Sequence, residues 1–225
     1  MKTNIPSAVL ENYKKILRKV SHMQNGDVSR LLQKMGISYR LNYGVSIPHL
    51  RQIGSEYLPN NELAFLLMKR DIREAKIISS MLFEVEKLTK GQILEIASQL
   101  NNQELIEQFS KNMLSHAPNL PELLDTWLSK SLKESTLAFY TASWAIKQNH
   151  PAKDEILSWV TNTFQLAAVT DNPQLNQAIL FAMQTVYQTN EQYQQKMKDL
   201  AEKMMHTENN SVRSLGQEFL WLNAT

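Results

Sequence analysis

Cysteine is missing from this 225-residue chain, and glycine is scarce, with six residues. The missing thiols exclude a disulfide framework and cysteine-based catalysis, which fits a reducing compartment. No apolar run approaches the length of a membrane span, and the first fifteen residues lack the apolar core and cleavage site of a secretory signal. We therefore expect a cytoplasmic protein with no membrane partner.

The sequence also lacks several motifs that mark enzymes and metal sites. It contains no Walker loop, no glycine-rich dinucleotide fingerprint, no H-E-x-x-H and no G-x-S-x-G nucleophile elbow. The five histidines are scattered along the chain, and no two of them stand at the helical spacing of metal ligands. We therefore expect neither a metal ion nor a cofactor.

Charge is unevenly distributed, although the formal net charge is only +2. Residues 1–76 hold 13 Lys/Arg against 6 Asp/Glu, whereas residues 77–195 hold 7 against 12. A basic end of this kind is typical of a surface that faces a polyanion. It is equally consistent with ordinary basic surface helices that are balanced by acidic ones elsewhere.

Residues 42–84 carry the clearest structural signals, because they contain three helix starts. Ser46 is placed to cap one helix, and the run Pro59-Asn60-Asn61 breaks the chain and offers an asparagine cap to the next. Asp71, with Glu74 three residues later, has the spacing of a capping box. Helices this short do not persist alone in water, so we expect them to stack on one another.

The rest of the chain repeats this pattern. Apolar residues recur with the helical period, Asn, Pro and Asp separate the segments, and no stretch alternates with the period of a strand. About a dozen helices, paired roughly every 35–45 residues, are typical of a HEAT-like array. We predict an all-α superhelix, an α-α solenoid forming one domain over residues 1–225; an irregular helical bundle is the alternative.

Segments within this pattern resemble the AlkD-like DNA alkylation repair family of HEAT-like helical arrays. The run YGVSIPHLRQIGSEY and the D-x-R-E-A helix carry the similarity, together with QAILFAMQTVYQTN and, more weakly, SVRSLGQEFL. The resemblance covers roughly residues 25–220. The matching positions in the first two segments are Gly44, Val45, Pro48, Leu50, Arg51, Arg73 and Glu74.

The resemblance implies an activity, the excision of alkylated purines from DNA. A cationic N-alkylpurine is a good leaving group, so a carboxylate that stabilises the developing sugar cation is more useful than a general acid. A basic surface would hold the duplex through its phosphates. The family's constellation is a Trp, an Asp one turn later, an Arg on the next helix pair and a further Trp.

Carried onto this sequence, those four positions fall at Gln103, Glu107, Tyr140 and Phe181. Glu107 keeps the carboxylate and Phe181 keeps a ring, whereas Gln103 and Tyr140 differ in type. Glu107 is therefore the candidate catalytic residue. The candidate DNA-binding residues are Phe181, Tyr140, Gln103, Arg51 and Arg73.

Each candidate also has a plain structural interpretation. A solvated helix face explains Glu107, and an arginine can equally pair with a neighbouring carboxylate. Phe181 and Tyr140 are the kind of residue that usually lies in a core. The same holds for the tryptophans Trp127, Trp144 and Trp159.

Two functional hypotheses remain. One is a monofunctional DNA glycosylase that hydrolyses the N-glycosidic bond of cationic alkylated bases in duplex DNA. The other is a non-catalytic HEAT-like module that binds DNA or a protein partner through its concave face. In either case we expect a monomer.

Overall fold

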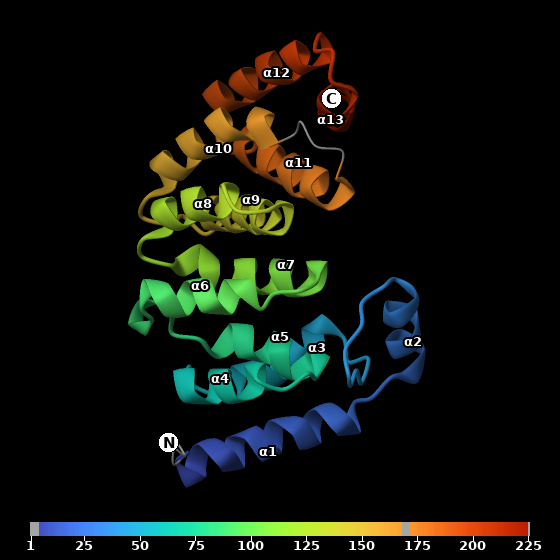
Figure 1. Ribbon diagram of the computed structural model, residues 1–225, viewed down its shortest axis with the longest axis vertical. Coiled ribbons are helices and arrows are strands. Elements are labelled where there is room, and N and C mark those ends of the chain that lie inside the picture. The colour runs from blue at the N-terminus through green and yellow to red at the C-terminus, as the bar shows by residue number, and fades with distance from the viewer. Residues whose placement is uncertain (1–4, 168–171, 225) are drawn as a thin grey trace. The chain divides into compact units, whose positions relative to one another are not determined.

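The computed structural model describes residues 5–167 and 172–224, and the chain in these ranges is all-helical. It divides into two compact units, residues 1–89 and 90–225, each of which is described by itself. The prediction of one domain over residues 1–225 stays a prediction. The elements of unit 1 are α1 (Ser7–His22), α2 (Gly26–Lys34), α3 (Ile47–Ser55), α4 (Asn61–Met68), α5 (Arg73–Leu82) and the 3₁₀ turn η1 (Val85–Lys87) (Figure 1).

Unit 2 contains eight α-helices and one 3₁₀ turn within its described residues. In chain order these are α6 (Lys90–Ser98), α7 (Gln103–Asn112), η2 (Leu114–His116), α8 (Leu120–Leu128), α9 (Leu132–Lys147), α10 (Lys153–Ala167), α11 (Pro173–Tyr187), α12 (Glu191–Met205) and α13 (Asn210–Leu222).

Asparagine caps set six of the helix starts within the described residues. In each case the side-chain oxygen accepts a hydrogen bond from a backbone N–H in the first helical turn, which would otherwise have no partner. The asparagine cap predicted within Pro59-Asn60-Asn61 is confirmed and falls at Asn60, since its Oδ1 accepts from the Leu63 N–H at 2.8 Å. The other caps of this kind are Asn25, Asn102, Asn172, Asn190 and Asn209.

The structure differs from the sequence prediction at two expected caps, Ser46 and Asp71. Ser46 occupies the N-cap position of α3, but its hydroxyl bonds His49 Nδ1 at 2.9 Å and not a backbone N–H. The capping box of Asp71 and Glu74 is wrong, because α5 is preceded by Ile72 and has no side-chain cap. Asp71 Oδ2 accepts instead from the Arg40 N–H at 2.9 Å, and this bond is the largest cause that lowers the pKa of Asp71.

Glu74 is a buried anchor of unit 1. Its carboxylate is fully buried and accepts from the backbone N–H groups of Tyr43 at 3.2 Å and Val45 at 3.3 Å. The Arg73 guanidinium, also buried, lies 3.1 Å from Glu74 and donates to the Val45 carbonyl at 2.8 Å. Burial of these charges is tolerated because each has several partners, and the result is that the 43–45 loop is fixed against α5.

Gly44 lets this loop lie directly against the start of α2. Its φ is +71°, and a Cβ built at this position would lie 2.1 Å from the Asn25 carbonyl oxygen. The loop is further held by hydrogen bonds from the Asn25 N–H to the Tyr43 carbonyl and from the Ser29 hydroxyl to the Asn42 carbonyl. Helix α2 has no buried residue, so these contacts hold it in place.

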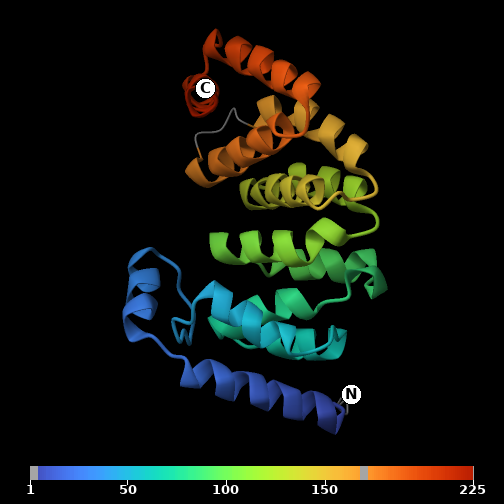
Figure 2. The same cartoon turned by 180° about the vertical axis from the view of Figure 1, so that it is seen from behind.

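Unit 2 is organised around α9, which is buried continuously from Ser135 to Ser143. Helices α7, α9 and α11 lie side by side in that order, and Figure 2 shows this row from behind. Helices α8 and α10 also pack on α9, while α12 and α13 pair with each other next to α11. Several buried hydroxyls within this packing are hydrogen-bonded locally, for example Ser110 with Thr141 at 3.0 Å.

We expect Gly44→Ala to destabilise the protein more than Gly36→Ala. Both glycines have positive φ, but no heavy atom lies within 4 Å of a Cβ added at Gly36. The Gly36 variant therefore measures the cost of the strained backbone conformation alone, about 1 kcal/mol. The Gly44 variant adds a clash with the backbone of Asn25, and we expect its loss in free energy of unfolding to be at least twice as large. Urea denaturation measures both, and equal losses would contradict the close approach of Gly44 to α2.

Candidate functional site

The fold brings together the four positions that the resemblance singled out in residues 90–225. Gln103 and Glu107 lie one turn apart on α7, Tyr140 lies in the middle of α9, and Phe181 lies on α11. The Gln103 side-chain amide donates to Glu107 Oε1 at 2.9 Å and approaches the Tyr140 hydroxyl at 2.8 Å. The rings of Tyr140 and Phe181 pack with their centroids 5.7 Å apart. The three helices therefore share one site.

The polar half of the site is a small network around the Tyr140 hydroxyl. Tyr140 is only 6% exposed, and this burial raises the pKa of its phenol, with the Glu107 carboxylate adding to the effect. The phenol therefore stays protonated at every physiological pH. Gln103 Oε1 is buried without a hydrogen-bond partner among the described residues, so the Gln103 amide is held by its donor side alone.

The aromatic half of the site includes residues that the sequence reasoning did not select. Phe181 lies between Tyr140 and Trp144, whose ring centroid is 5.8 Å from that of Phe181. Lys111 Nζ stands 4.4 Å from the Trp144 ring centroid, and Lys147 Nζ stands 5.6 Å from that of Phe181. Both distances are within the range of cation–π attraction. We call Tyr140, Trp144, Phe181, Lys111 and Lys147 the aromatic cluster.

Helical spacing gives the signal that would have found these additional residues. Lys111 lies one turn after Glu107 on α7, so it shares a face with the predicted carboxylate. Trp144 and Lys147 follow Tyr140 on one face of α9 in the same way. Extending the candidates by one turn would have added Lys111 and Trp144, and a second turn on α9 would have added Lys147.

The structure also tests the core interpretation of each aromatic residue. Trp127 is fully buried and Trp159 nearly so, with its indole N–H donating to Asp125 at 2.7 Å, so both belong to the core as expected. Trp144 and Phe181 are half-buried, and each presents part of its ring to solvent. Glu107 is half-buried as well and hydrogen-bonded to Gln103, which differs from a freely solvated helix face.

The two arginines expected to contact DNA lie in unit 1. Arg51 is exposed on α3, and its phosphate contact stays a prediction. Arg73 is 3% exposed and is used in the buried pairing with Glu74, so it cannot reach a phosphate without unpacking this part of unit 1. The expectation for Arg73 as a DNA contact is therefore replaced by its role in fixing the 43–45 loop.

Comparison with known proteins identifies the fold. No protein-family model matches the chain, and a search of curated proteins found no match. A solved structure does match, described as "a new family of proteins related to the HEAT-like repeat DNA glycosylases with affinity for branched DNA structures". It aligns over 94% of this chain and 94% of its own length, with a TM-score of 0.77 and 12% sequence identity. The chain has a HEAT-like repeat fold.

This result confirms the predicted fold class and the fold relationship that the resemblance implied. At 12% identity the likeness extends to the fold, so residue roles must be argued from the site itself. Across the described ranges, no helix combines the length and apolar character that a membrane span requires. In those same ranges, no three His, Cys, Asp or Glu side chains gather closely enough to hold a metal ion.

The raised pKa of Tyr140 predicts a specific loss of stability at high pH. An unfolded tyrosine releases its proton near the ordinary value of 10.0, whereas the folded phenol holds it to higher pH. The stabilisation is therefore complete below pH 10 and is lost as pH rises above it. We expect the free energy of unfolding of the wild type to fall more steeply between pH 9 and pH 11 than that of Tyr140→Phe. Urea denaturation at each pH measures this free energy. The same dependence on pH in both proteins would contradict the prediction.

Proposed function

We propose that this protein binds DNA and that the aromatic cluster contacts the sugar–phosphate backbone. The observation that carries the proposal is the pair of lysines, Lys111 and Lys147, standing beside half-buried rings on adjacent helices. Lys147 bonds the neutral Gln188 at 3.3 Å and has no carboxylate partner within the described residues, so its charge remains available to a phosphate. Cations beside ring faces are the combination that nucleic-acid grooves use.

The charge balance of the two units supports this proposal. Residues 1–89 carry 14 Lys/Arg against 8 Asp/Glu, and residues 90–225 carry 10 against 14. Unit 1 therefore supplies general attraction for a polyanion. In unit 2, where acidic residues are in excess, DNA contact must depend on locally placed cations such as those of the aromatic cluster.

Branched DNA is the form that we propose the protein prefers. The solved structure of the same fold belongs to proteins described as having affinity for branched DNA. The aromatic cluster gives a physical reason for such a preference here, because partly exposed rings gain most from bases that are unstacked, as they are at a branch point. A fully stacked duplex offers its phosphates but few free base faces.

Alanine substitutions of the two lysines test the proposal. If each contacts a phosphate, Lys111→Ala and Lys147→Ala should each lower the slope of log affinity against log salt by about 0.9 on branched DNA. Lys130→Ala is a matched control, because Lys130 is an exposed lysine of unit 2 outside the aromatic cluster. Equal effects of all three substitutions, or no binding of the wild type at about 50 mM salt, would contradict the proposal.

Removal of alkylated bases is a second candidate function, favoured by the position of Glu107. A carboxylate held by the Gln103 amide beside an aromatic surface is suited to stabilise a developing sugar cation and to orient a water molecule. Cationic bases such as 7-methylguanine would suit it best, since they leave without a general acid. Under this proposal Phe181 faces the sugar or the base.

The test is the release of 7-methylguanine from duplex DNA. We expect Glu107→Gln, which keeps the shape of the side chain but removes its charge, to abolish any release above the spontaneous rate while leaving DNA affinity intact. No release by the wild type at high protein concentration would remove the glycosylase and leave the binding module. Unchanged release by the variant would mean that another carboxylate acts.

A further inference from the structure

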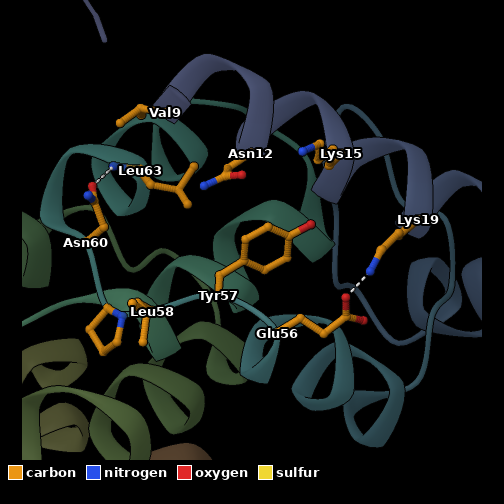
Figure 3. A pocket seen from close by; sticks show the side chains of 10 residues that line it. Val9, Asn12, Lys15, Lys19, Glu56, Tyr57, Leu58, Asn60 and Leu63 are labelled. Carbon is orange, nitrogen blue, oxygen red and sulfur yellow. Dashed lines mark hydrogen bonds and ion pairs between the residues drawn. The ribbon is translucent and has the colours of Figure 1, made fainter. Parts of the chain in front are cut away.

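Unit 1 contains a pocket of about 610 Å³ that the proposed function does not use. It lies between α1 and the chain that leaves α3 and enters α4 (Figure 3). Its volume is within the range of small-molecule binding sites. The lining residues are Val9, Asn12, Lys15, Lys19, Glu56, Tyr57, Leu58, Pro59, Asn60 and Leu63.

The lower wall of the pocket is held in place by the backbone. The Asn60 N–H donates to the Leu82 carbonyl at 2.8 Å, and Asn60 Oδ1 caps α4. The Tyr57 N–H donates to the Gly54 carbonyl at 3.1 Å, which fixes the last turn after α3. Because these bonds tie the wall to α3, α4 and α5, the pocket is formed before any ligand arrives.

The opposite wall presents polar groups of α1. Asn12, Lys15 and Lys19 share one face of the helix, and Figure 3 shows Asn12 and Lys15 above the Tyr57 ring and Lys19 beside it. Lys19 is paired with Glu56 and lies 5.9 Å from the Tyr57 ring centroid. The Lys15 ammonium and the Asn12 amide have no hydrogen-bond or ion-pair partner among the described residues.

Tyr57 and the apolar residues complete the chemistry of the pocket. The Tyr57 hydroxyl has no hydrogen-bond partner among the described residues, and burial raises the pKa of this phenol, so it remains a neutral donor. Leu58, 86% exposed, stands at the rim, and Val9 and Leu63 form an apolar side. The pocket thus combines a free cation, an amide, a ring and an apolar surface.

We propose that this pocket binds a nucleotide, with its phosphate at Lys15 and its base against Tyr57 and the apolar side. Asn12 is placed to bond an edge of the base or the sugar. The same chemistry is offered by a free nucleoside monophosphate and by an unpaired nucleotide of branched DNA. The inference rests on the proposed DNA function in assigning the nucleotide to a DNA strand.

Charge-matched variants of neighbouring lysines test the pocket. The probe is a fluorescent, 5′-phosphorylated dT5 oligonucleotide, and its affinity is measured by anisotropy on the full chain. We expect Lys15→Glu to weaken binding about tenfold or more, and Tyr57→Leu to do the same by removing the ring without changing charge. Lys14→Glu is the control, because Lys14 is exposed on α1 but does not line the pocket.

Asn12→Asp places a carboxylate beside the expected phosphate with little change in size, and it should also weaken binding. This variant keeps the test valid if Tyr57→Leu fails to fold, which thermal unfolding would reveal. Equal losses for Lys14→Glu and Lys15→Glu would overturn the proposal, since they would indicate general electrostatics. Failure of the wild type to bind dT5 would overturn it as well.

Competition with dTMP and thymidine identifies the source of the nucleotide. If dT5 binds at least tenfold more tightly than dTMP, the ligand is a DNA strand; equal affinities assign the pocket to free nucleotides. Thymidine binding as tight as dTMP would contradict the role of Lys15. The result is separable from the proposed function, because the variants of Lys111 and Lys147 lie in unit 2 and leave the pocket unchanged.

Discussion

The burial of α9 is the constraint on which the candidate site of unit 2 depends. A helix that is covered from Ser135 to Ser143 must satisfy its polar groups within the protein. Ser143 does so through its own helix, by donating to the Phe139 carbonyl at 2.7 Å, and Thr141 does so with Ser110 of α7. The Ser110–Thr141 bond links α9 to α7, and in this arrangement the Tyr140 hydroxyl lies against the Gln103 amide. The candidate site is thus built on a helix whose buried hydroxyls are hydrogen-bonded within the protein.

Unit 1 also buries polar groups that must be hydrogen-bonded within the protein, and here the groups are charged. Arg73 and Glu74 are adjacent in sequence and both are buried, which is stable only because backbone groups of the 43–45 loop complete their hydrogen bonding. This arrangement explains why the observed contacts of both residues differ from those that the sequence predicts. Glu74 has the spacing of a capping box and Arg73 has the chemistry of a phosphate contact, but their actual partners lie about thirty residues earlier. Local patterns carry no information about contacts at that distance.

The parts of the fold that sequence could predict are those governed by local physics. The asparagine cap at the start of α4 follows from the needs of the first helical turn, so a few residues are enough to predict it. The grouping of Gln103, Glu107, Tyr140 and Phe181 followed from a family resemblance, and the structure places them together. Trp144 was not selected because an aromatic residue at helical spacing is usually core, whereas in the structure it is half-buried although Ser143 and Ala145 beside it are buried.

The four altered positions are best understood as a set. The resemblance implies a Trp, an Asp, an Arg and a Trp, whereas this chain has Gln103, Glu107, Tyr140 and Phe181, and the Gln103 amide bridges the other two polar groups. A glutamine can make that bridge and a tryptophan cannot, because the indole has a single donor. The Tyr140 position carries a neutral phenol where the resemblance implies an arginine. Lys111 and Lys147 lie one and two turns farther along the same helices, and each stands beside a ring, Lys111 by Trp144 and Lys147 by Phe181.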